Sequence, residues 1–426
     1  MMTSRERVMA TLAHEEPDRV PVDLGGGPVT GMHVSVVYKL RQSLGLDEPG
    51  RPVKVVEPYQ MLGEIEPDLM DALGIDVVGV ASPKNMFGFV NDGWKDWMTF
   101  DGTPVLVPEG FNTDVEENGD LFLYAEGDKS YPPAGRMPAG GWYFDSTRRQ
   151  YPIDDEDLNV EDNLEDFGPV SDEDLAYFAE TTRRLYEETD KAIFGNFGGT
   201  GFGDIALVPG PWLKDPKGIR DVEEWYISTI SRRDYIMEVF ERQCEIGLQN
   251  LARIHEAVGD RVAAILVSGT DFGTQRGPFI SNRTYRRLYK PFHIRVNEWI
   301  HANTGWKSFI HSCGSVVKLI PEFIEAGFDI LNPVQCSATG MEAAGLKEQF
   351  GKDVTFWGGG VDTQKTLPFG TVDEVRAEVA ERVRIFGPGG GFVFNTIHNV
   401  QPLSPPDNVL AVYETVREAG QYPIHK

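Results

Sequence analysis

Residues 306–314 read Trp-Lys-Ser-Phe-Ile-His-Ser-Cys-Gly, an extended apolar run that closes on a glycine corner. His311 and Cys313 are two residues apart at the end of this run, so in a β-strand both side chains point to the same face. Zinc accepts both imidazole nitrogen and thiolate as ligands, and two ligands make half of a tetrahedral site. The stretch therefore predicts a strand that carries part of a metal site at its carboxyl end.

Eight runs of this strand-like kind occur along the chain, and several end at glycine-rich or polar corners. They cover residues 19–24, 75–80, 192–197, 262–267, 307–313, 328–334, 354–357 and 391–396. Helix-type segments fit between most of these runs, and the clearest one begins at the capping box Thr371-Val-Asp-Glu374. Repeated βα units that count to eight predict an α/β fold, a closed (β/α)8 TIM barrel with its helices outside.

The alternation is interrupted between the second and third strands, at about residues 82–170. Turn signals such as Asp101-Gly102 and Asn118-Gly119 predict β-hairpins in this stretch. We expect residues 1–426 to form one barrel domain, with this insertion packed over one end. Five aromatic residues of the insertion either line a substrate or pack in a core: Trp94, Trp97, Trp142, Tyr143 and Phe144.

The charge balance excludes several classes of partner. The chain has 40 lysine and arginine residues against 66 aspartate and glutamate residues, a formal net charge of -26. Such a chain repels polyphosphates and anionic membrane surfaces, so we expect neither nucleic acid nor membrane as a partner. A homodimer is one of the assemblies that the sequence allows.

The cellular compartment is predicted from three features. No apolar run approaches the ~20 residues that span a bilayer, and the charged N-terminus lacks the apolar region of a signal peptide. Three cysteines in a long chain are typical of free thiols in a reducing compartment. The sequence therefore predicts a soluble cytoplasmic protein.

A third metal ligand has to come from another strand end, because two ligands do not complete a zinc site. His398 follows the eighth strand and Cys336 follows the sixth. Strand ends converge around a barrel axis, so both residues are sterically eligible. Position in the chain alone leaves the choice between them open.

The end of the fourth strand carries Asp271 and Gln275. A carboxylate beside a zinc site can orient a ligand, serve as a fourth ligand or act as an acid or base, and the amide can bind substrate. We therefore take both as candidate catalytic residues. The alternative for Asp271 is a structural role in a turn or helix cap.

Other polar side chains lie at strand ends or in a neighbouring loop. Asn332 and Gln335 follow the sixth strand, Asp362 follows the seventh, and Glu57 and Tyr59 lie in a loop before the second. We take these five as candidate substrate-binding residues. Their alternative role is to satisfy backbone amides of the loops.

Six short motifs, spread over nearly the whole chain, together resemble one known superfamily. They are Thr3-Ser-Arg-Glu-Arg-Val, Glu16-Pro-Asp-Arg-Val-Pro21, His311-Ser-Cys-Gly314, Asn332-Pro-Val-Gln335, Trp357-Gly-Gly-Gly-Val-Asp362 and Pro405-Pro-Asp-Asn408. The chain resembles the uroporphyrinogen decarboxylase superfamily and, within it, the corrinoid-dependent methyltransferases rather than the haem-pathway decarboxylase. The resemblance implies a (β/α)8 barrel.

The resemblance also implies a zinc ion held by His-x-Cys and a distant cysteine near the C-terminus. The first two positions fall on His311 and Cys313, whereas the distant cysteine falls on His398. The register thereby favours His398 over Cys336. A His2Cys site is less anionic than one with two thiolates, so the metal would either activate a thiol acceptor or polarise a methoxy oxygen.

The implied function is methyl transfer between a small methylated compound, such as a methoxylated aromatic, and the cobalt of a partner corrinoid protein. One alternative is a decarboxylase of a porphyrinogen or another polycarboxylate. Recognition of many carboxylates calls for clustered arginines, and residues 23–33 after the first strand contain none. A second alternative is a non-catalytic barrel that binds small ligands and no metal.

Overall fold

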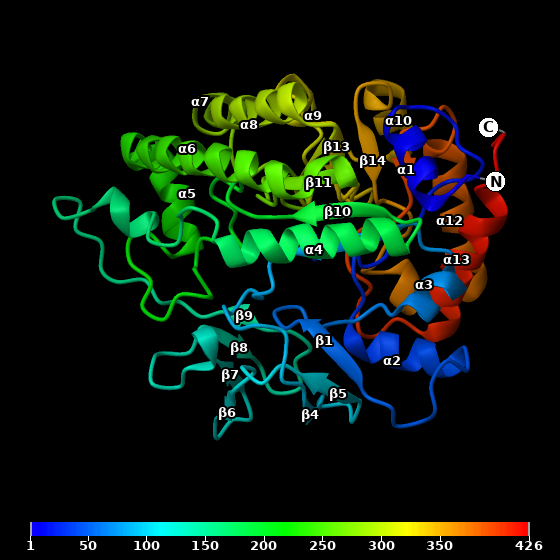
Figure 1. Cartoon of the computed structure of the whole chain (residues 1–426), viewed down its shortest axis with the longest axis horizontal. Coiled ribbons are helices and arrows are strands. Elements are labelled where there is room, and N and C mark those ends of the chain that lie inside the picture. Colours follow the sequence, from blue (N-terminus) through cyan, green and yellow to red (C-terminus); the bar gives the residue numbers. More distant parts are fainter. Residues whose placement is uncertain (1, 425–426) are drawn as a thin grey trace.

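The computed structural model describes residues 2–424, and its centre is a curled parallel sheet of seven strands (Figure 1). In spatial order the strands are β15 (Phe392–Val393), β14 (Thr355–Trp357), β13 (Ile330–Asn332), β12 (Lys307–His311), β11 (Val262–Ser268), β10 (Ala192–Asn196) and β3 (Val77–Ala81). Aliphatic and aromatic side chains dominate these strands, as expected for a parallel sheet covered on both faces. Seven of the eight predicted runs therefore contain strands of one parallel sheet.

The first predicted strand, residues 19–24, is wrong as a strand but occupies the eighth position. The backbone N–H of Asp23 donates to the carbonyl of Phe394 at 2.8 Å, and the N–H of Asp76 donates to the carbonyl of Val22 at 2.8 Å. The segment thus bridges the β15 side and the β3 side of the sheet. A regular ladder is interrupted because Pro21 has no N–H and because the N–H of Val22 donates to the Asp76 side chain at 2.9 Å.

Asp76 anchors this closing segment through two arginines. Its fully buried carboxylate accepts from Arg7 Nη1 at 2.6 Å and from Arg19 Nη1 at 2.7 Å. Arg7 lies on helix α1 (Ser4–Leu12), so one buried charge joins the N-terminal helix, the bridging segment and the start of β3. The closure of the sheet therefore depends on an ion-pair cluster as well as on backbone hydrogen bonds.

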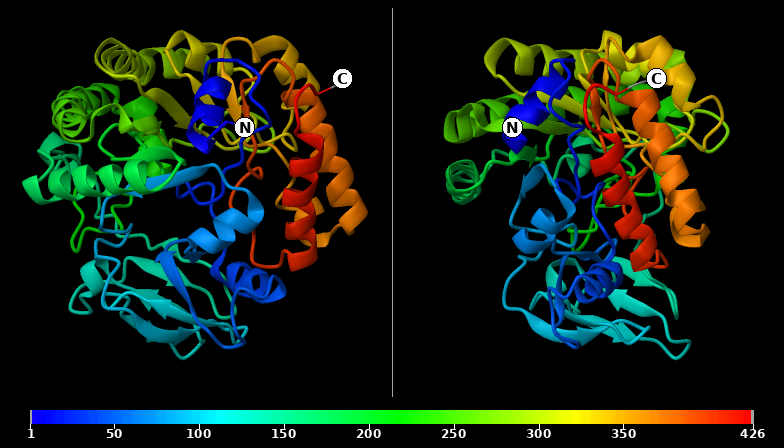
Figure 2. Two further views of the ribbon diagram at one scale, coloured as in Figure 1. Left: turned by 45° about the vertical axis from the view of Figure 1, so that its right-hand side comes forward. Right: turned by 90° about the vertical axis from the view of Figure 1, so that its right-hand side faces the viewer.

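Helices flank the sheet on its outside (Figure 2). Those that follow or join the sheet strands are α4 (Asp172–Glu188), α5 (Val222–Ser231), α6 (Arg233–Val258), α7 (Asn282–Leu288), α8 (Lys290–Asn303), α9 (Ile320–Glu325), α10 (Ala343–Phe350), α11 (Thr366–Phe369), α12 (Val372–Phe386) and α13 (Pro406–Ala419). The capping box predicted at Thr371 and Glu374 is confirmed at the start of α12. Within residues 2–424, no helix has the length and apolar character needed to cross a membrane.

Two small sheets gather at one end of the molecule (Figures 1 and 2). One has the order β2 (Leu62–Gly63), β1 (Val53–Glu57), β5 (Pro104–Val107) and β4 (Lys95–Met98); the other has β6 (Thr113–Val115), β7 (Leu121–Leu123), β8 (Gly135–Met137) and β9 (Asp145–Ser146). The hairpins β4–β5 and β6–β9 fall in the predicted insertion and are antiparallel. The sequence did not indicate that β1, which precedes β3, pairs in parallel with β5. Helices α2 (Val34–Ser43) and α3 (Pro67–Leu73) complete this part of the chain.

Candidate metal centre

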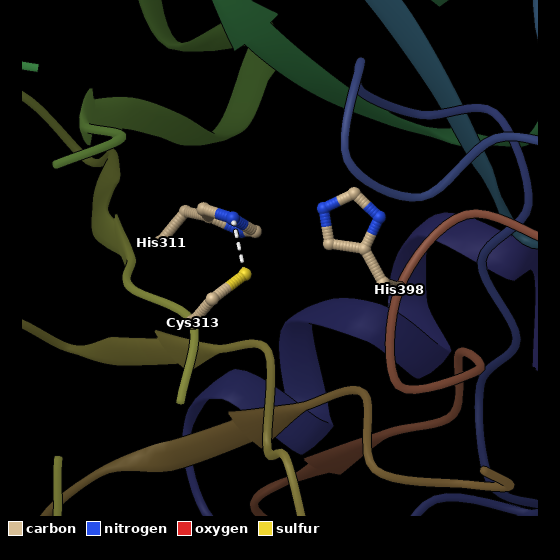
Figure 3. Close-up of side chains that lie close together, drawn as sticks. All are labelled: His311, Cys313 and His398. Carbon is tan, nitrogen blue, oxygen red and sulfur yellow. Dashed lines mark hydrogen bonds between the residues drawn. The ribbon is translucent and has the colours of Figure 1, made fainter. Parts of the chain in front are cut away.

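Three potential metal ligands meet at the carboxyl ends of the strands. His311 is the last residue of β12, Cys313 lies two residues beyond it, and His398 lies in the loop after β15. Their ligand atoms all lie within 4.8 Å of one another. Figure 3 shows the imidazole of His398 facing the other two side chains from a separate loop. His311 is buried, whereas Cys313 and His398 are partly exposed, so the group is open on one side.

His311 is held in one orientation by Asn332. The amide nitrogen of Asn332 donates to the carbonyl of Trp357 at 2.7 Å, which turns its Oδ1 toward His311 Nδ1 at 2.6 Å. Because Oδ1 can only accept, Nδ1 carries the proton and Nε2 keeps a free lone pair. Nε2 lies 3.4 Å from the sulfur of Cys313, on the side of the ligand group. This is the arrangement by which an outer partner prepares a histidine for a metal.

The protonation of the other two ligands is set by burial. Desolvation by burial lowers the pKa of His398 to about 3, so its imidazole is neutral at physiological pH. Desolvation and the negative charges of Asp271 and Asp204 raise the pKa of the Cys313 thiol well above its usual range. A metal ion would reverse this second effect, because a coordinated thiol loses its proton. Two nitrogens and one sulfur, with an open side, fit a catalytic zinc site.

Asp271 lies directly beside this group. Its Oδ1 accepts the backbone N–H of Cys313 at 2.6 Å and is 3.8 Å from His311 Nε2. Its own backbone carbonyl accepts the hydroxyl of Tyr226, on α5, at 2.6 Å. The side chain therefore fixes the position of Cys313 and borders the metal group.

Gln335 and Gln275 stabilise the loop after β12, which carries Cys313 and Gly314. Gln335 Oε1 accepts the N–H of Gly314 at 2.7 Å, and its Nε2 donates to Gln275 Oε1 at 3.1 Å. Gly314 has a φ of +84°, and a Cβ there would lie 2.5 Å from the backbone of Gly273. The loop after β12 thus crosses the loop after β11 at a distance that only glycine permits.

Comparison with known proteins agrees with this architecture. A model of the uroporphyrinogen decarboxylase (URO-D) family matches residues 144–419. The chain belongs to this family. The uroporphyrinogen decarboxylase of Janthinobacterium sp. (strain Marseille) is 30% identical over 104 residues, which are 22% of this chain and 28% of that protein. The chain therefore matches little more than a quarter of the length of this curated relative.

A solved structure of a methyltransferase from Methanosarcina mazei matches with a TM-score of 0.54 at 16% identity, over 98% of this chain and 99% of that one. At this identity the likeness shows the fold alone. The superfamily expected from the sequence motifs is thus confirmed. The methyltransferase branch stays a prediction.

Cys336 lies outside the metal group of this URO-D family member. The charged groups that act on its thiol are Arg382, Glu378 and Asp362, toward helix α12. Asp362 itself accepts the N–H groups of the two residues that begin the next turn, at 2.7 and 3.1 Å. The structure therefore brings His398, and not Cys336, to His311, and it gives Asp362 a turn-forming contact.

Glu57 and Tyr59 are linked to the loop that carries His398 through Gln60. The carboxylate of Glu57 accepts the N–H groups of Tyr59 and Gln60 at 3.0 and 2.7 Å, and burial raises its pKa to about 7. Gln60 Oε1 in turn accepts from Asn399 Nδ2 at 2.8 Å, next to His398. The loop 57–60 therefore supports the loop that carries His398. Among the described residues, neither Glu57 nor Tyr59 forms a hydrogen bond to a metal ligand.

Among the aromatic residues of the insertion, some line a cavity and others pack in the core. Trp97 and Trp142 line a cavity of about 250 Å³ together with Phe100 and His33. Phe144 is buried and packs edge-on against Phe111, at 5.8 Å between ring centroids. The cavity belongs to the two small sheets, and its lining includes none of the three metal ligands.

Sequence reasoning missed one acidic residue near the metal group, Asp204. It is buried in the loop after β10, and burial together with the charge of Asp271 raises its pKa to about 7. The available signal was its position, because it is the first carboxylate after the glycine-rich corner 198–203 at the end of the third predicted strand.

Proposed function

We propose that this protein transfers a methyl group between a small methylated compound and the cobalt of a corrinoid carried by a partner protein. The observation that carries the proposal is the group His311, Cys313 and His398, which offers a nitrogen, nitrogen and sulfur ligand set with an open side. Membership of the URO-D family and a fold shared with a methyltransferase are compatible with it. The corrinoid acts as a substrate on its own protein.

In this proposal the three side chains hold zinc, which when bound supplies a Lewis acid for the heteroatom that bears the methyl group. The chain itself provides the orientation. Asn332 fixes the ring of His311, Asp271 fixes the backbone of Cys313, and Gln335 fixes the glycine that follows. Such positioning is what a site needs when the nucleophile belongs to another molecule.

Decarboxylation of a polycarboxylate is the competing function, and the short match to a uroporphyrinogen decarboxylase favours it. The charge of the site opposes it. Among residues 2–424, no lysine or arginine forms an ion pair with Asp204 or Asp271, and the nitrogen nearest to Asp271 is Nε2 of His311 at 3.8 Å. Several substrate carboxylates would meet two protein carboxylates without the clustered arginines that bind them in bidentate fashion.

The experiment compares the two reactions on one preparation. We expect the purified protein to hold one zinc ion per chain and to form methylcobalamin from reduced cobalamin and a methoxylated aromatic compound. His398→Ala should lose both the zinc and the transfer, because two ligands remain. Release of CO2 from a porphyrinogen without any methylcobalamin would replace the proposal by decarboxylation. Ligand binding with neither reaction and no zinc would indicate the non-catalytic barrel.

A further inference from the structure

Asp204 is a buried carboxylate with little to stabilise a charge. It is 8% exposed, and its Oδ1 accepts one backbone N–H, from Ala206, at 3.0 Å. No other hydrogen bond and no ion pair of this carboxylate occurs within the described residues 2–424. A carboxyl group placed in this way favours its protonated form.

The carboxyl group rests against the strand end that carries Asp271. A Cβ built on Gly269, the residue after β11, would lie 2.4 Å from Asp204 Oδ2. The backbone of Gly269 has no positive φ, so a side chain at this position would be opposed only by the carboxylate end of Asp204, which would have to move. The chain therefore leaves out a side chain at the strand end, and the second oxygen of Asp204 occupies that place.

The charge of Asp204 interacts with three groups on other elements. Asp271 follows β11, Tyr226 lies on α5, and Cys313 follows β12. Burial is the first cause that raises the pKa of Tyr226 and of Cys313, and the negative charges of Asp271 and Asp204 add to it. Asp271 contacts both residues, since its carbonyl accepts the Tyr226 hydroxyl at 2.6 Å and its carboxylate accepts the Cys313 N–H at 2.6 Å. Asp204 makes no described hydrogen bond to any of the three metal ligands. It thus borders the site without belonging to the ligand set.

We propose that Asp204 supplies the proton that the departing oxygen takes up when a methyl ether donates its methyl group. This inference rests on the proposed function and narrows its substrate class to methyl ethers. In the step, the C–O bond breaks and its electron pair stays on oxygen, which takes the proton of Asp204. The methyl carbon bonds to cobalt(I) of the corrinoid, whose electron pair forms the new bond, and Asp204 regains a proton from water.

The chemistry explains why such a group is needed. An ether oxygen leaves poorly as an anion, and a general acid is most effective when its pKa lies near the working pH. Burial raises the pKa of Asp204 to about 7, which meets this condition. The reverse reaction uses the same residue as a base, because both directions pass through one transition state.

The test is Asp204→Asn with a series of methyl aryl ethers that differ in the acidity of the phenol released. Single-turnover methyl transfer to reduced cobalamin should fall ~100-fold or more for a weakly acidic phenol such as that of 4-methoxytoluene. It should fall less than about threefold for 4-nitroanisole, whose leaving group needs little protonation. With the weakly acidic donor, the wild-type rate should fall as pH rises through about 7, and this limb should be lost in the variant.

Asp166→Asn is the matched control, because Asp166 is also a buried carboxylate with a raised pKa, but near Arg220. This variant should leave the ratio of the methyl-transfer rates for the different ethers unchanged. An Asp204→Asn variant that holds zinc and slows every donor by the same factor would overturn the inference and leave the methyltransferase proposal standing. A wild-type protein that transfers methyl from none of the ethers would overturn the proposed function itself.

Discussion

Asn332→Ala tests whether Asn332 raises the zinc affinity of the site by orienting His311, apart from its contribution to folding stability. The substitution removes the acceptor of His311 Nδ1 at 2.6 Å and the donor to the Trp357 carbonyl at 2.7 Å. Loss of an outer partner costs about 10–100-fold in metal affinity, which is about 1.4–2.8 kcal/mol. The buried carbonyl left without a donor costs about 1–3 kcal/mol of folding free energy.

Asn297→Ala provides the matched control. Asn297 is likewise buried, on α8, and its amide donates to the carbonyl of Ala326 at 2.7 Å. Its removal should lower the free energy of unfolding by a similar amount and leave the zinc affinity unchanged. Zinc affinity is measured by competition with a chelating dye, and the free energy of unfolding by denaturant titration of the zinc-free proteins.

Two results would refute this reasoning. If Asn332→Ala binds zinc within twofold of the wild type, the amide does not prepare His311 for the metal. If both variants lose zinc affinity in proportion to their loss of stability, the effect is one of folding and the orientation of His311 is irrelevant to it.

Three further predictions follow from other contacts. Zinc affinity should rise with pH, by about tenfold per unit near neutrality, because Cys313, whose pKa is raised, must release a proton to bind the metal; a chelator titration at several pH values checks this, and a flat profile would contradict it. Asp76→Ala should destabilise the fold by about 3 kcal/mol, since Arg19 would lose the carboxylate it pairs with and Arg7 would keep Asp18 alone; a loss under 1 kcal/mol in denaturant unfolding would disprove the anchoring role. Cys336→Ala should keep full zinc stoichiometry by elemental analysis, and its loss would return that thiol to the ligand set.

Much of the barrel could be predicted because each sheet strand is a short apolar run followed by a polar or glycine corner. The run at 19–24 has the same appearance and is not a strand. This run differs from the others because the side chain of Asp76, more than fifty residues away, accepts the N–H of Val22. A contact so distant in sequence leaves no local pattern.

The metal site shows the same division. The spacing of His311 and Cys313 is a local signal, although β12 ends at His311 and Cys313 lies beyond it. Chain position left the choice between His398 and Cys336 open, because both follow a strand of the same sheet. The family resemblance favoured His398, and the fold brings His398 to the other two ligands. Asp204 was missed because its importance depends on its burial and on its contact with Gly269, and neither can be read from residue type alone.

The pairing of β1 with β5 has a consequence for protein engineering. The sheet that contains them is assembled from two stretches of chain, residues 53–63 and 95–107, on either side of β3. Excision of the later stretch would leave Val53 and Val55, now buried, without their neighbouring strand. A chimera that exchanges this region between family members therefore has to carry both stretches. Because β3 lies between them in the sequence, the exchanged segment includes β3 as well.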